Sequence, residues 1–132
     1  MTDTSKLPEE LRYTKTHEWI RAEGDRATVG ITDHAQAELT DIVFVDLPAA
    51  GKPLTAGASV LVLESVKTVA DVYAPGVGTL ESVNGELKAH PEYVNQDPYG
   101  KGWLFRIQLT TPIDAATLLT AAEYRAFLDA GG

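Results

Sequence analysis

Lys67 is the residue whose surroundings most clearly suggest chemistry. It lies in the segment VLVLESVKTVADVYAP, residues 60–75, which is otherwise rich in apolar, β-branched side chains. Buried among them without a partner, its ammonium would be costly; exposed, it would be a single charge held on a rigid support. Two interpretations follow: an ordinary solvated lysine at the tip of a hairpin, or a lysine offered there for covalent acylation.

Few other residues form a pattern typical of a reactive site. The chain has no cysteine, which excludes disulfides, Cys-ligated zinc and thiol nucleophiles. His17, His34 and His90 lack the spacing of a zinc-binding helix, so solvated or hydrogen-bonded roles are favoured over a metal site. Nucleophile elbows, phosphate-binding loops and dinucleotide-binding glycine motifs are absent from the sequence, and its serines show no triad pattern. An independent enzyme is therefore the least favoured class.

Two strands, at about 59–66 and 69–74, are predicted to meet at Lys67. The β-branched residues around the lysine lose rotamer freedom in a helix and pack well on a sheet. The turn between the strands must then fall at 66–68, although no Gly, Asn or Asp marks it. A firm turn signal, PGVG, follows at 75–78.

The rest of the chain alternates short β-like runs with turn signals, which favours a mostly β sandwich or barrel. The further strands are expected at 17–21, 26–31, 42–47, 79–83 and 103–109. The first two would form a hairpin around a turn at 23–25, and the strand at 42–47 reads as buried. Residues 48–53 and 86–102 are predicted to be loops.

Helical patterns occur in two places. A short helix is expected over 33–39, where Asp33 and Gln36 have capping-box spacing. A second helix is expected over 120–130, since Thr120 is followed three residues later by a glutamate and then by apolar residues at helical spacing.

Length and charge narrow the function classes. The 132 residues fit a single domain over 1–132, with 1–12 as a polar arm. The net charge of −8, from 19 acidic and 11 basic residues, argues against nucleic-acid binding. The chain lacks an apolar run long enough to cross a membrane, and its N-terminus lacks the pattern of a secretory signal. We therefore expect a cytoplasmic bacterial protein, with a monomer as the default.

Several segments together resemble one family, the H proteins of the glycine cleavage system. The resemblance runs from about Tyr13 to Phe127, nearly the whole chain. It is carried in order by GITDHAQ (30–36), DIVFVDLP (41–48), ESVK (64–67), DVYAP (71–75) and VNQDPYGKGWL (94–104). The resemblance implies a mostly β hammerhead fold, the barrel-sandwich hybrid of lipoyl and biotinyl carriers, with short helices that include one at the C-terminus.

The resemblance also implies roles for four residues. The lysine of ESVK, here Lys67, would carry (R)-lipoate in amide linkage. Glu64, three residues earlier, would help the lipoylating enzyme recognise the hairpin. Glu18 lies in the motif THEW and Asp71 matches the family's acid after the lysine, so both are candidates to contact the cationic amine of the loaded arm.

The implied function is that of a non-catalytic carrier. A pyridoxal-phosphate glycine decarboxylase (P protein) would pass an aminomethyl group to the lipoyl dithiolane and reduce it. A tetrahydrofolate-dependent aminomethyltransferase (T protein) would take the one-carbon unit and release ammonia, and dihydrolipoamide dehydrogenase (L protein) would reoxidise the dithiol. A lipoate ligase or lipoyltransferase would attach the cofactor. The lack of cysteine is consistent with redox sulfurs that arrive with the cofactor.

The chain departs from the family beside the lysine, and other classes stay open. Thr68 and Val69 stand where the family usually has alanine and a small residue, which bears on how efficiently a ligase modifies Lys67. Biotin acceptors usually have Met-Lys-Met, and 2-oxoacid dehydrogenase lipoyl domains usually have Asp-Lys-Ala; neither occurs here. A non-carrier interaction module remains the alternative from a different class.

Overall fold

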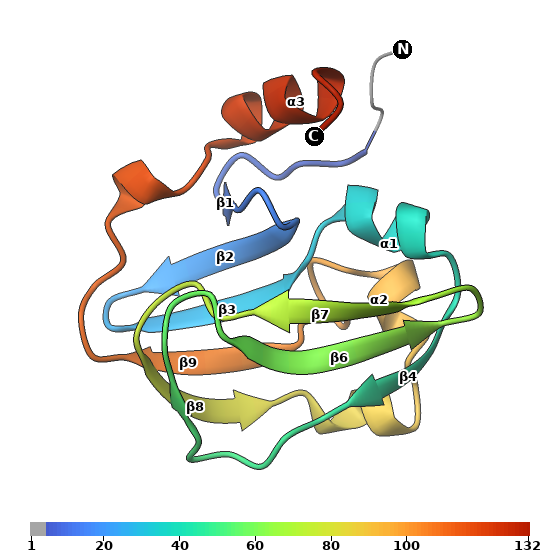
Figure 1. Cartoon of the computed structure of the whole chain (residues 1–132), viewed down its shortest axis with the longest axis horizontal. Coiled ribbons are helices and arrows are strands. Elements are labelled where there is room, and N and C mark those ends of the chain that lie inside the picture. The colour runs from blue at the N-terminus through green and yellow to red at the C-terminus, as the bar shows by residue number, and fades with distance from the viewer. Residues whose placement is uncertain (1–4) are drawn as a thin grey trace.

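The computed structural model describes residues 5–132, in which two antiparallel sheets face each other around one main core (Figure 1). The larger sheet has the order β1-β2-β3-β9-β8-β5, with β1 at Arg12–Tyr13, β2 at Glu18–Glu23, β3 at Arg26–Ile31, β9 at Phe105–Leu109, β8 at Gly78–Val83 and β5 at Pro53–Leu54. The smaller sheet has the order β4-β6-β7, with β4 at Ile42–Asp46, β6 at Ser59–Ser65 and β7 at Val69–Tyr73. The predicted mostly β sandwich is therefore confirmed.

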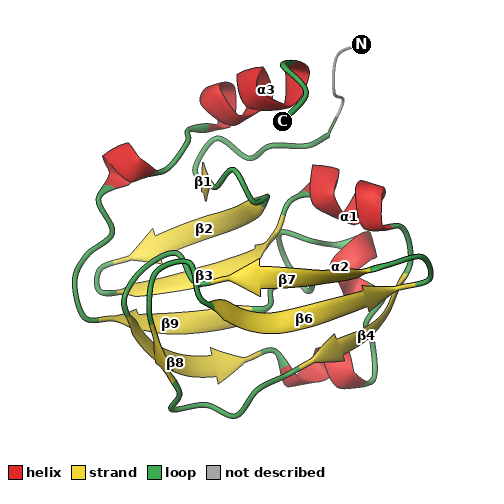
Figure 2. Cartoon of the chain, viewed as in Figure 1, coloured by secondary structure: helices red, strands yellow, loops and turns green. Residues whose placement is uncertain are grey.

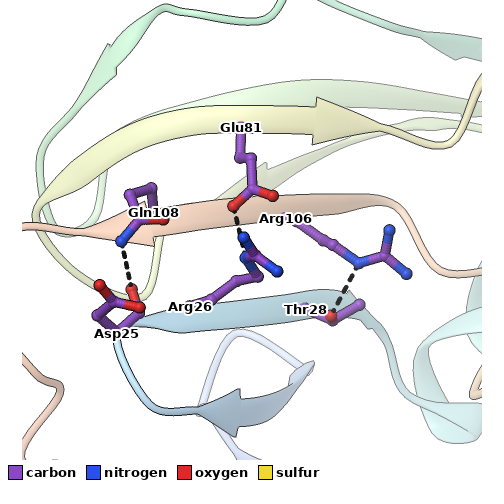
Figure 3. Close-up of polar contacts among 6 residues, drawn as sticks. All are labelled: Asp25, Arg26, Thr28, Glu81, Arg106 and Gln108. Atoms are coloured by element: carbon purple, nitrogen blue, oxygen red, sulfur yellow. Dashed lines mark hydrogen bonds and ion pairs between the residues drawn. The ribbon is translucent and has the colours of Figure 1, made fainter.

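Side-chain alternation explains why the larger sheet has one apolar and one polar face. In β9, Phe105, Ile107 and Leu109 are buried in the main core, while the residues between them are half-buried. Figure 3 shows the polar face, where Arg106 donates to Thr28 Oγ1 (3.4 Å) and Arg26 pairs with Glu81 at 2.7 Å. Both partners of that ion pair are solvent-accessible, so it contributes little to stability.

A second, smaller core lies between the N-terminal strands and the last helix, α3, which spans Ala121–Asp129. The rings of Tyr13 and Tyr124 stack there at 4.9 Å, beside the fully buried Trp19. The predicted capping box of α3 is confirmed, because Thr120 accepts from the Glu123 amide and the Glu123 carboxylate accepts from the Thr120 amide. This packing holds α3 over the β1–β2 end of the molecule (Figure 1).

Helix α1 spans Asp33–Leu39, as predicted, but the predicted cap is wrong by one residue. Thr32 has an extended backbone, and its hydroxyl accepts from the Ala35 amide at 3.2 Å. The Gln36 side chain instead donates to the Asp33 carboxylate at 2.9 Å. Threonine and aspartate are both good cap residues, so their order in the sequence does not decide between them.

The prediction of a buried strand at 42–47 is wrong for part of its length. A β-bulge between Ile42 and Phe44 interrupts the pairing of β4 with β6. Because a bulge adds one residue to one strand, the alternation of faces is broken there. Ile42 and Val45 are buried, whereas Val43 and Phe44 are exposed.

The expected loop at 86–102 contains two single-turn helices, η1 at Gly85–Lys88 and α2 at Tyr93–Gln96. Such short turns leave almost no periodic signal. A further one, η2, spans Ala115–Thr117. Over residues 5–132, no helix combines the length and apolar character needed to cross a membrane.

Candidate functional site

The hairpin tip at 66–68 forms as predicted, with Lys67 in the middle of the three-residue loop between β6 and β7. The last paired residues are Glu64 and Val69, and the Ser65 amide donates to the Thr68 carbonyl at 2.8 Å. Figure 2 shows the loop between β6 and β7 projecting at the edge of the molecule, beyond the end of the smaller sheet. Lys67 is thus presented on a short loop with a paired sheet directly behind it.

The Ser65 hydroxyl explains how this loop forms without glycine or asparagine. Short hairpin loops often include a residue with a positive φ angle, which glycine, asparagine and aspartate tolerate best. Among the non-glycine residues that the structure describes, only His17 and Thr40 have one. The Ser65 Oγ accepts from the amides of Lys67 (3.3 Å) and Thr68 (3.1 Å), which pairs donors at the tip.

The Lys67 side chain is exposed, and its ammonium has no hydrogen-bond or ion-pair partner within residues 5–132. The tip is also tied to the segment before β4, since the Val66 amide donates to the Asp41 carbonyl at 3.0 Å. The Nζ atom is therefore accessible while its backbone is fixed.

Glu64 lies on the outer face of the smaller sheet. It is exposed and stands in register between Phe44 of β4 and Val69 of β7, both of which are exposed as well. Its carboxylate is thus on the same surface from which the hairpin tip extends, a direction that the sequence alone did not give.

Glu18 is buried, with an exposed fraction of 2%. The hydroxyls of Thr14 and Thr16 donate to its Oε1, each at 2.5 Å, and the Tyr73 amide donates to its Oε2 at 3.4 Å. Burial raises the pKa of this carboxyl above its ordinary value, and the hydrogen bonds from Thr14 and Thr16 oppose that shift. Its Oε2 keeps capacity to accept from a further donor.

Asp71 is exposed on β7 and accepts from the Ser59 hydroxyl at 2.8 Å. It lines a cavity of about 580 Å³ whose walls include Leu39, Leu63 and Leu128. Glu18 does not line this cavity but a neighbouring one of about 400 Å³. Thr16 lines both, so the structure places the two acids in adjacent cavities rather than in one.

His17 and His34 also line the larger cavity, a proximity that the sequence did not reveal. Their ring centroids lie 5.0 Å apart, and His17 Nδ1 is 2.7 Å from the Tyr124 hydroxyl. The β2–β3 hairpin brings His17 and His34 together, since the Thr32 amide donates to the His17 carbonyl just before α1. The contact of His17 with Tyr124 arises because α3 packs back over the N-terminal strands. Within residues 5–132, no group of three or more metal-ligating side chains is assembled.

Comparison with known proteins now decides the family. The family described as Glycine cleavage H-protein matches residues 11–131. The chain belongs to this family. Glycine cleavage system H proteins of Acinetobacter baumannii strain SDF and Rubrobacter xylanophilus are 51% and 52% identical to it, covering 92% and 91% of this chain and 98% and 93% of their own. A crystal structure titled as a glycine cleavage system H protein from Mycobacterium marinum superposes with a TM-score of 0.84 at 41% identity, covering 93% of this chain and 99% of that one.

The H-protein family consists of lipoyl carriers, and the residues of this chain fit such a group. Attachment needs an accessible amine, which Lys67 offers. A flexible, largely aliphatic arm also needs an apolar surface on which to lie, and the larger cavity, lined by Leu63 and Val72 of the same hairpin, has one with Asp71 at its margin.

Proposed function

We propose that this chain carries a lipoyl group on Lys67 and transports the aminomethyl group of glycine between the enzymes of a glycine cleavage system. The observation that carries the proposal is the Lys67 amine, exposed and without a partner on a braced hairpin, in a member of the H-protein family. When bound, the lipoyl group supplies the redox-active disulfide that this cysteine-free chain lacks.

The chain contributes an accessible nucleophile to the attachment step. The neutral Nζ of Lys67 attacks an activated lipoyl carbonyl, an amide bond forms, and the proton and the activating group leave to the modifying enzyme. Because the ammonium has no carboxylate partner within residues 5–132, no ion pair must be broken before the modifying enzyme engages it. Glu64, on the adjacent surface, is proposed to help the modifying enzyme recognise the hairpin.

The cavities beside the hairpin are proposed to receive the loaded arm. The larger cavity offers apolar walls to the aliphatic chain, with Asp71 at its margin. Glu18 in the adjacent cavity is the candidate to meet the cationic amine, because its Oε2 accepts only one long hydrogen bond. Thr16, which lines both cavities, joins the two positions.

The partners that follow are the glycine decarboxylase, the aminomethyltransferase, dihydrolipoamide dehydrogenase and a lipoate ligase or lipoyltransferase. The chain acts as a non-catalytic, monomeric, single-domain carrier in the bacterial cytoplasm, a setting that its bacterial relatives support. Its net charge of −8 favours partners with basic surfaces.

Intact mass tests the proposal. The purified chain is incubated with lipoate, ATP and a lipoate ligase, beside a Lys67→Arg variant. We expect one added lipoyl group on the wild type and none on the variant, followed by lipoyl-dependent glycine–bicarbonate exchange with a cognate decarboxylase. An unmodified wild type, in a reaction that lipoylates another carrier, would favour the interaction module instead.

A further inference from the structure

Large apolar side chains on the surface of this protein concentrate around the Lys67 hairpin. Five such residues are well exposed among those that the structure describes, and four of them lie on β4 or flank the hairpin tip: Val43 (53%), Phe44 (49%), Val66 (65%) and Val69 (60%). The fifth, Val77 (48%), lies in the turn before β8. Exposed apolar residues are ordinary when scattered, but a cluster of them marks a contact surface.

The register of the smaller sheet makes three residues a single row. Phe44 stands opposite Glu64, and Glu64 stands opposite Val69. Since neighbouring strands lie about 4.8 Å apart, the row spans roughly 10 Å across β4, β6 and β7. With Val66 at the tip, this row forms what we call the hairpin surface: Phe44, Glu64, Val66 and Val69.

The charged residues within the three strands of the smaller sheet are all acidic. The next outward-facing row of the sheet carries Asp46 and Asp71 on either side of Val62. These strands contain no lysine, arginine or histidine. The cations near them include Lys67 at the tip and Lys88, which lines a cavity with Phe44 and Asp46. A partner that covers this face must offer apolar contacts together with basic groups.

We propose that the hairpin surface is the docking surface for the enzyme that acylates Lys67. This inference rests on the proposed acylation of Lys67 and adds the surface that the modifying enzyme recognises. A fully extended lysine side chain reaches only about 6 Å, so an active site that holds Nζ must press against the residues beside the tip. Val66 precedes the lysine and Val69 follows it by two residues, and the bulge of β4 turns Phe44 outward to extend the same face.

The expected partner site is an apolar groove with an arginine or lysine placed to pair with Glu64. An interface of this kind draws most of its affinity from a few central apolar anchors, here Phe44 and Val69. Thr68 and Val69 depart from the family pattern. In this proposal Val69 also has a role, because it supplies part of the contact with the modifying enzyme.

The test compares the rate of lipoylation of four proteins by one lipoate ligase, read by intact mass. Phe44→Ser and Val69→Ser are expected to lower kcat/KM about tenfold, mainly through KM, because each removes an apolar anchor. Val77→Ser is the matched control, a valine of similar exposure away from the hairpin, and should be modified at the wild-type rate. Thermal unfolding of each variant verifies that the fold is intact.

A second measurement tests the binding of the modifying enzyme separately from the acylation step. The Lys67→Arg protein cannot be acylated, so we expect it to inhibit lipoylation of the wild type competitively. Adding Phe44→Ser or Val69→Ser to it should weaken that inhibition about tenfold, whereas adding Val77→Ser should not. Val66→Ser, in the exposed loop, replaces any variant that fails to fold.

The outcomes separate the two proposals. A wild type that gains no lipoyl group overturns the acylation of Lys67 and the docking surface with it. A wild type that is modified, with Phe44→Ser and Val69→Ser modified equally fast and inhibiting equally well, overturns the docking surface alone. In that case the exposed apolar face would instead be a contact surface for another enzyme of the glycine cleavage system.

Discussion

The Glu18 carboxyl is buried and accepts three hydrogen bonds. Its burial and its hydrogen bonding each have a consequence that can be measured. Thr14 and Thr16 saturate one oxygen, while the other accepts a single long bond from the Tyr73 amide. Ionising a carboxyl in this setting costs free energy, yet its second oxygen can accept a hydrogen bond from a cationic group that enters the cavity.

Replacing Glu18 with glutamine should shorten the lifetime of the loaded carrier by about tenfold, because a neutral amide gives up the charge-assisted bond to the amine. Glu23→Gln, an exposed glutamate at the end of the same strand, is the control. The decay of the aminomethyl-loaded form is followed by intact mass. Equal lifetimes for the Glu18→Gln protein and the wild type would remove Glu18 from the proposed site.

The raised pKa of Glu18 also predicts a dependence of unfolding on pH. The folded protein holds this proton more tightly than the unfolded chain, so the stabilising contribution is full below the ordinary pKa of 4.5 and is lost as the pH rises through the higher folded value. We expect the free energy of unfolding of the wild type, relative to Glu18→Gln, to fall as the pH rises above about 4.5. Urea titrations of both proteins from acid to neutral pH measure it; parallel curves would contradict it.

Ser65 provides a third test at the residue scale. Removing its hydroxyl with Ser65→Ala should cost no more than about 1 kcal/mol of stability, since the bonds are exposed, but should loosen the backbone under Lys67. We expect lipoylation to slow several-fold, about threefold to tenfold. Ser65→Thr, which keeps the hydroxyl, should restore the rate, and failure of that rescue would count against the role of the hydroxyl.

At the scale of elements, α3 is held by its cap and by its contacts with the N-terminal strands. Thr120→Ala removes one half of the capping box and should lower the free energy of unfolding by about 1 kcal/mol. Thr111→Ala, an exposed threonine outside any helix or strand, is the control and should change it by less than about 0.5 kcal/mol. Denaturant unfolding monitored by circular dichroism measures both.

The longer strands and the two longer helices could be predicted because their signals are local. The hairpin tip has no turn residue of its own and is placed only by the two strands that flank it. Period-two burial, capping-box spacing and β-branched composition all act over a few residues. The bulge at Val43 could not, since a bulge depends on which residue of the partner strand is opposite. The contact of His17 with His34 was not predicted either, although it follows from the register of β2 with β3, which places His17 beside Thr32 at the start of α1.

At the scale of the whole molecule, the two sheets present different kinds of side chain to solvent. The larger sheet presents paired polar groups such as Arg26 and Glu81 (Figure 3), while the smaller sheet presents acids and apolar residues and carries the lysine at its tip. Encounters with basic partners should therefore be directed to the hairpin end, within a field that salt screens.

Raising the salt from about 0.05 to about 0.5 M should increase the KM for lipoylation several-fold while leaving kcat nearly unchanged, because screening weakens association and not the chemistry. Steady-state rates at a series of salt concentrations measure this. Glu64→Gln should show a shallower salt dependence than the wild type, and an identical slope would mean that Glu64 takes no part in the electrostatic attraction.

The larger cavity and the Lys67 tip belong to the same hairpin, since Asp71 and Val72 line the cavity from β7. A lipoyl group attached to Lys67, as proposed, would meet the cavity as an intramolecular ligand, at an effective concentration of the order of millimolar or above. A cavity that binds the free group only weakly would still be occupied much of the time. This effective concentration also sets an upper limit on the useful affinity of the cavity for the tethered group. A partner enzyme would have to compete with that local binding in order to take the arm out of the cavity.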